Sequence, residues 1–110
     1  MSPRSIVPHR HAIDDALDAV DYYRENAGTP IAESFSLAVD EALEQVGQHP
    51  NIGSPRTALD LDIEGIKAWS LRRFLHQIYY KVFSDRIELC RVLHPNTPAR
   101  VASLSVPINI

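Results

Sequence analysis

Two segments in the first half of the chain carry apolar residues at the three- and four-residue spacing of an amphipathic helix. In residues 12–26 these positions are Ile13, Ala16, Leu17, Val20 and Tyr23, and in residues 31–48 they are Ala32, Phe35, Val39, Ala42, Leu43 and Val46. Only a short turn around Gly28 separates the two segments, so we expect an antiparallel helical hairpin. The residues expected to pack this hairpin on a sheet are Leu17, Val20, Phe35, Val39, Leu43 and Val46.

After Gly65 the period of the pattern shortens to two, which is typical of β-strands. A loop over residues 51–64 precedes three predicted strands, at residues 66–71, 75–83 and 87–93. Because the links between these strands are too short for a crossover helix, we expect an antiparallel meander. Ser5 to Val7 could add a short strand ahead of the first helix. The expected fold class is therefore α+β, with the order β-α-α-β-β-β and the helix hairpin packed on one face of a small antiparallel sheet.

The last predicted strand is apolar on both of its faces. Simple alternation puts Ile87, Leu89 and Leu93 on one face and Cys90 and Val92 on the other. A strand with one solvated face should instead alternate between apolar and polar residues. The helices can cover only one face, so either the tail of the chain or a second polypeptide should cover the other. The apolar positions of that tail also alternate, at Leu104, Val106, Ile108 and Ile110.

The composition is that of a globular protein. The chain has 110 residues, of which 45% are hydrophobic and 23% are charged. This length predicts a single domain over residues 1–110, in which residues 96–110 form a C-terminal tail. No apolar run approaches the roughly 18 residues of a membrane span, so we expect no membrane association. The only cysteine, Cys90, allows no internal disulfide, and a reducing cytoplasm is the expected location. Cys90 itself is expected to be a buried, unreactive side chain.

The net charge of −3 hides an asymmetry between the two halves of the chain. Residues 1–55 have nine acidic and three basic side chains, whereas residues 56–110 have five acidic and eight basic ones. Solvated helix faces account for an acidic first half. If the protein binds an anionic partner, that partner should contact the basic second half.

Candidate chemistry is sparse. The sequence has no phosphate-binding loop, nucleophile elbow or dinucleotide fingerprint, and its five histidines lack metal-site spacing, so we expect neither a cofactor nor a metal. Four residues would suit a metal-independent ribonuclease: Arg72, Arg73 and Arg91 to hold phosphate, and His94 as the acid or base. The alternative is that the arginines are solvated and that His94 packs at the end of a strand.

Several short patterns between Ala12 and His94 follow one another in a fixed order. The first helix contains Ala12, Asp15 and Tyr22 in an A-x-x-D…Y pattern, and the second ends at Pro50-Asn51-Ile52-Gly53. The strands contain Gly65-Ile66-Lys67, FLHQIYYKV at residues 74–82 and IELCRVLH at residues 87–94. In order and spacing these patterns resemble the ParE branch of the ParE/RelE superfamily, the toxins of bacterial type II toxin–antitoxin modules.

The resemblance implies the β-α-α-β-β-β fold and a role in plasmid stabilisation. It also implies a ParD-like antitoxin that wraps over the toxin, which we expect at Cys90, Val92, Leu104 and Val106. ParE-like toxins are regarded as poisons of DNA gyrase, whereas RelE-like relatives are ribosome-dependent mRNA endonucleases. The chain has no tyrosine after Tyr80, unlike many RelE-type enzymes, which favours gyrase binding without catalysis. The alternatives are a RelE-like ribonuclease and an inactive member that only binds its antitoxin and regulates its operon. We expect no sequence-specific DNA binding by the chain alone.

Overall fold

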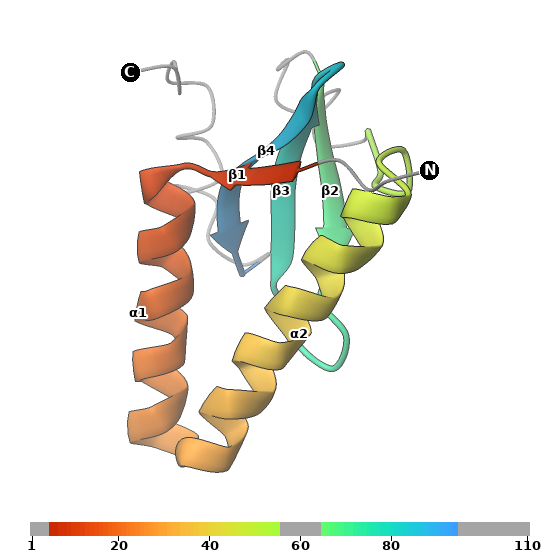
Figure 1. Ribbon diagram of the computed structural model, residues 1–110. Coiled ribbons are helices and arrows are strands. Elements are labelled where there is room, and N and C mark those ends of the chain that lie inside the picture. The colour runs from red at the N-terminus through yellow and green to blue at the C-terminus, as the bar shows by residue number, and fades with distance from the viewer. Residues whose placement is uncertain (1–4, 56–64, 95–110) are drawn as a thin grey trace.

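The computed structural model describes residues 5–55 and 65–94 and has the predicted order of elements. These are β1 (Ser5–Pro8), α1 (Arg10–Ala27), α2 (Thr29–Gln48), β2 (Ile66–Ser70), β3 (Gln77–Val82) and β4 (Arg86–Leu93). The two helices meet at Gly28 and lie together on one side of the sheet (Figure 1). The α+β fold class is therefore confirmed. No helix in this described part of the chain is both long and apolar enough to cross a membrane.

The sheet is mixed because β1 adds to it in parallel. Its strand order is β1-β4-β3-β2, and β2, β3 and β4 form the expected antiparallel meander. β1 pairs with the first half of β4, from Ser5 opposite Arg86 to Pro8 opposite Leu89. A strand at the start of the chain can pair in parallel here because the whole helix hairpin and the meander form its crossover connection.

The helix hairpin buries more side chains through α2 than through α1. Phe35 and Val46 are fully buried there, and Leu43 is partly buried against the same core. The predicted contact of Leu17 is wrong, since this residue is 58% exposed on α1. The buried face of α1 is instead centred on Ala12 and Asp15, with Val20 partly buried beside them. The small side chain of Ala12 lets α1 lie close to the rest of the fold, and Asp15 has polar partners there, described below.

An irregularity between Tyr79 and Tyr80 changes which face the end of β4 presents. Tyr80 pairs with Leu89, but Tyr79 pairs with Arg91, so Cys90 has no opposite residue in the ladder. Such an extra residue reverses the alternation beyond it. Val92 therefore joins Ile87 and Leu89 in the core under the helices, and Leu93 does not. The simple alternation predicted from the sequence was wrong for these two residues.

The segment after α2 is fixed by one tyrosine hydroxyl. The backbone N–H of Gly53 donates to the Tyr80 hydroxyl at 2.9 Å, and that hydroxyl donates to the Pro50 carbonyl at 2.9 Å. A β-carbon at position 53 would collide with the same hydroxyl, so glycine is required there. The Pro50–Gly53 pattern that ends the second helix is thus a docking site for a side chain from β3.

Candidate functional site

The C-terminal end of β4, which we call its far end, contains a buried ion pair. Asp15 of α1 accepts hydrogen bonds from Arg91 Nε at 2.7 Å and Arg91 Nη2 at 3.0 Å, and from the backbone N–H of Val92 at 3.1 Å. The side chains of Asp15 and Arg91 are only 5% and 12% exposed. Val92 lies beyond the residues of β4 that pair with β1, so Asp15 takes the place of a strand partner for this amide. The hydrogen bonds to Asp15 raise the pKa of Arg91 above its usual value.

His94 follows directly after β4 and lies in a cluster of aromatic rings. Its imidazole meets that of His76 edge to face, with the ring centroids 5.2 Å apart. His76 also contacts Phe35 and Tyr23, at 4.9 Å and 6.0 Å between centroids. Burial lowers the pKa of His76 to about 4, and the nearby His94 contributes to the lowering. At neutral pH His76 is therefore an uncharged ring that packs against this cluster.

Arg72 and Arg73 lie in the turn between β2 and β3, which the Leu71 N–H closes by donating to the His76 carbonyl at 3.0 Å. The Arg72 guanidinium is exposed and lies 3.9 Å from Glu41 of α2. Arg73 has a backbone φ of 72°, in the left-handed region that side chains other than glycine rarely adopt. Together with α2 the two arginines border a shallow cavity of about 230 Å³.

The four residues proposed for a ribonuclease belong to three different settings. The Arg91 guanidinium binds Asp15, His94 contacts His76 edge to face, and Arg72 lies opposite Glu41 of α2. A ribonuclease of this kind needs cations and an acid–base pair around a single phosphate. Arg91 has its charge engaged by a buried carboxylate, so its geometry suits a structural role.

Cys90 is fully buried, as expected from its place in a strand. Its Sγ lies 3.8 Å from the Glu88 carbonyl oxygen, and burial raises the pKa of the thiol to about 11. A thiol with this pKa is protonated at neutral pH and does not act as a nucleophile. Among the described residues, no three His, Cys, Asp or Glu side chains gather as a metal site would require.

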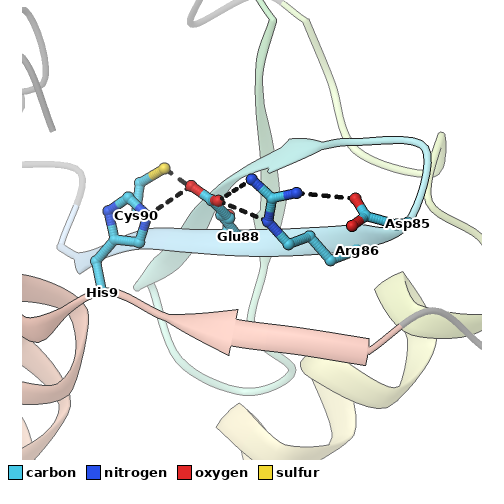
Figure 2. A network of polar contacts seen from close by, with 5 residues as sticks. All are labelled: His9, Asp85, Arg86, Glu88 and Cys90. Atoms are coloured by element: carbon cyan, nitrogen blue, oxygen red, sulfur yellow. Dashed lines mark hydrogen bonds and ion pairs between the residues drawn. The ribbon is translucent and has the colours of Figure 1, made fainter. Parts of the chain in front are cut away.

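The N-terminal end of β4, which we call its near end, contains a polar network that the sequence patterns did not indicate (Figure 2). Glu88 accepts from His9 Nε2 at 2.8 Å and from Arg86 Nε at 2.8 Å, and Arg86 also pairs with Asp85 at 2.8 Å. Hydrogen bonding by His9 and then by Arg86 lowers the pKa of Glu88. His9 and Glu88 are 79 positions apart, so no local pattern could have linked them.

Comparison with models of known protein families gives a match for this chain. The family described as "ParE toxin of type II toxin-antitoxin system, parDE" matches residues 6–97. The chain belongs to the ParE toxin family. It is thus a toxin of the type II toxin–antitoxin class, as the resemblance in its sequence patterns implied. A search of curated proteins found no match.

A solved structure shares the fold of this ParE-family chain. It is described as "Chromosomal ParDE TA system from P. aeruginosa", and its matching chain is 20% identical in sequence with a TM-score of 0.71. The match covers 83% of this chain and 95% of that one. Identity at this level supports a common fold.

The residues that carry the family resemblance are largely structural. Asp15 and Arg91, from two separate patterns, form the buried ion pair, and Gly53 and Tyr80 form the contact that fixes the end of α2. Tyr22 is different because its side chain is 61% exposed. The parts of the chain that the family resemblance singles out thus explain its fold better than its choice of target.

Proposed function

We propose that this toxin acts by binding DNA gyrase, without catalysis of its own, and that a ParD-like antitoxin neutralises it in the cytoplasm as part of a plasmid-stabilisation module. Membership of the ParE family supports the choice of gyrase. One observation favours binding over RNA cleavage: the Asp15 carboxylate, which also accepts from the Val92 amide, holds Arg91 in a buried contact. This arrangement leaves the arginine poorly suited to bind a scissile phosphate.

Two assays separate the proposed activity from its alternatives. The full chain should inhibit DNA supercoiling by purified gyrase and leave mRNA on translating ribosomes intact. A chain that cleaves mRNA would support the RelE-like ribonuclease. A chain that does neither but binds its antitoxin would support the inactive member.

The variant His94→Ala tests the same choice at one residue. A toxin that acts by contact needs no proton transfer from His94, so we expect inhibition of gyrase to persist. A ribonuclease that uses this imidazole should lose roughly 10²- to 10⁴-fold in rate. Because His94 packs against His76, thermal unfolding of the variant must be measured alongside. A variant that folds but no longer harms cells would contradict the proposal.

We propose that the antitoxin binds the sheet face on which Cys90 lies, together with Leu104 and Val106. Cys90 itself is fully buried, so the proposed contact is with the surface around it. Five buried residues of the sheet lie outside the core cluster that packs under the helices: Ile66, Ala68, Tyr79, Cys90 and Leu93. Val92 is not part of this proposal, because it packs in that core. Leu104 and Val106 lie outside the described residues.

The antitoxin contact is testable by substitution in the tail. Leu104→Ser and Val106→Ser should weaken binding of the cognate antitoxin, whereas Ser105→Ala between them should not. Binding is measured by titration of the purified chain with its antitoxin. Equal affinities for all three variants would contradict the proposed contact.

A further inference from the structure

A groove lies between α2 and the turn that joins β2 to β3. We call it the turn groove. Leu37, Ala38 and Glu41 of α2 form one side, and Arg72, Arg73 and Phe74 form the other. Its volume of about 230 Å³ is below the range of roughly 300–1,000 Å³ typical of small-molecule pockets. The groove has room for one or two side chains of a partner.

The apolar part of the turn groove combines an aromatic ring that packs on the core with an exposed leucine. The Phe74 ring packs against Phe35 and Tyr23, with centroid distances of 5.2 Å and 5.3 Å, and so joins this side of the groove to the core. Leu37 at the edge is 68% exposed. A large apolar side chain next to a cavity offers contact area to an apolar group of a partner.

The charged part of the groove favours an anion. Arg72 lies 3.9 Å from Glu41, at the outer limit of an ion pair, and the two side chains are 73% and 45% exposed. Arg73 has no ion pair among the described residues, and its φ of 72° is a strained conformation for an arginine. Strained residues of this kind gather at functional sites. A glycine would adopt this turn without strain, so folding alone does not require an arginine here.

We propose that the turn groove binds an acidic segment of a partner protein, with an apolar side chain against Leu37 and Phe74 and a carboxylate at Arg72 and Arg73. The two guanidinium groups give the charge complementarity, because arginine pairs with carboxylates in a bidentate geometry. The Glu41 carboxylate offsets one of the two cations, so the groove carries one net positive charge, which suits a single carboxylate better than a run of phosphates. This proposal goes beyond the proposed function, since it holds whichever protein supplies the segment.

The test uses the full chain and short synthetic peptides that carry leucine or phenylalanine between aspartate and glutamate. Matched peptides have asparagine and glutamine in place of the acids. Binding is measured by fluorescence anisotropy, and the site is located by NMR shifts of the Leu37 methyl groups. We expect saturable binding of the acidic peptides, weakened at least about tenfold when the amides replace the acids.

Matched variants identify the groove as the site. Leu37→Ser should weaken peptide binding, whereas Leu75→Ser should not, although Leu75 is equally exposed at 67%. Arg73→Glu should weaken binding, whereas Arg10→Glu on α1 should not. Arg73→Gly is the most informative change, because it relieves the strain: binding should fall while the thermal midpoint stays the same or rises.

Three results would overturn the proposal. The first is a lack of saturable binding by the acidic peptides up to about 1 mM, the weakest affinity that a specific contact of this size should have. The second is equal binding of the acidic and the amide peptides. The third is tighter binding of a single-stranded oligonucleotide at the same salt concentration, lost in the same arginine and leucine variants, which would assign the groove to nucleic acid.

Discussion

The two halves of β4 are joined to the start of the chain by different kinds of contact. In the first half, β1 supplies a backbone ladder, and the His9–Glu88–Arg86 network adds side-chain contacts that are only partly buried (Figure 2). The second half of β4 extends beyond the residues that pair with β1. There the carboxylate of Asp15 contacts Arg91 and the Val92 amide in a buried setting.

The difference shows where a polar contact is essential. Solvent can replace a lost partner near the surface, so exposed ion pairs contribute little to stability. A buried charge without its partner has no such replacement, and removing one member of the pair leaves the other desolvated. We therefore expect the far end of β4 to be far more sensitive to substitution than the near end.

Asp15→Ala should have the largest effect on stability. It removes the carboxylate that accepts hydrogen bonds from the Arg91 guanidinium and the Val92 amide, at a cost of about 3–5 kcal/mol in the free energy of unfolding. The measurement is a urea titration followed by circular dichroism. The double variant Asp15→Leu with Arg91→Met is the control, because an apolar pair should recover much of the loss. A single variant that loses less than about 1 kcal/mol would show that the buried pair is not essential.

Acid should destabilise the fold through His76, which lies beside His94 at the far end of β4. Its pKa is about 4 in the folded chain against 6.5 for the free side chain, chiefly because of burial. Between these values the unfolded chain takes up a proton that the folded chain does not, so this contribution to stability is complete above pH 6.5 and is lost as the pH falls toward 4.

The loss from His76 should reach at most about 3 kcal/mol. His76→Phe keeps a ring in the aromatic cluster but removes the titrating imidazole. Comparison of the variant with the parent chain therefore separates the effect of His76 from that of the carboxylates, which titrate in a similar pH range. Free energies of unfolding measured from pH 7 to pH 4 should fall less steeply in the variant. Parallel curves would exclude His76 as a source of the pH dependence.

Tyr80→Phe extends the comparison to a buried group without charge. It removes one hydroxyl that bonds both to the Gly53 amide and to the Pro50 carbonyl, and we expect a loss of about 1–3 kcal/mol. Tyr79→Phe is the matched control on the same strand, since that hydroxyl bonds only to the Gln77 side chain among the contacts described. Both are measured by urea unfolding, and equal losses would mean that the Pro50–Gly53 contact adds nothing.

Glu88→Gln should have the smallest effect. The amide keeps an acceptor for His9 or Arg86, and the backbone ladder between β1 and β4 remains. We expect the thermal midpoint to fall by at most about 3 °C, with the difference shrinking further at high salt. A larger and salt-independent fall would show that the two ends of β4 are alike.

Local patterns were enough to predict the elements and their order. The three- and four-residue spacing around Phe35 and Val46 identified α2 and its buried face, and the change to a period of two after Gly65 identified the meander. Short links then determined that neighbours in sequence are neighbours in space. These signals are reliable because they arise from backbone periodicity and from the length of chain available.

The groups that make up the candidate sites came together only in the folded chain. Arg72 and Glu41 face each other across the turn groove because the turn after β2 reaches α2, and His9 finds Glu88 because β1 pairs in parallel with β4. Such partners are tens of residues apart, and a single sequence has no periodic signal that links them.

The sequence alone determined an α+β chain with a helix hairpin, a three-stranded meander and the patterns of the ParE family. The tertiary structure decided how these parts meet: the extra residue at Cys90 turned Val92 into the core, and the approach of α1 left Leu17 in solvent. It also brought Asp15 into contact with Arg91, although the two residues are 76 positions apart in the sequence. The physical reason is that alternation and helical spacing are local, whereas burial of a charge depends on which partner the whole fold supplies.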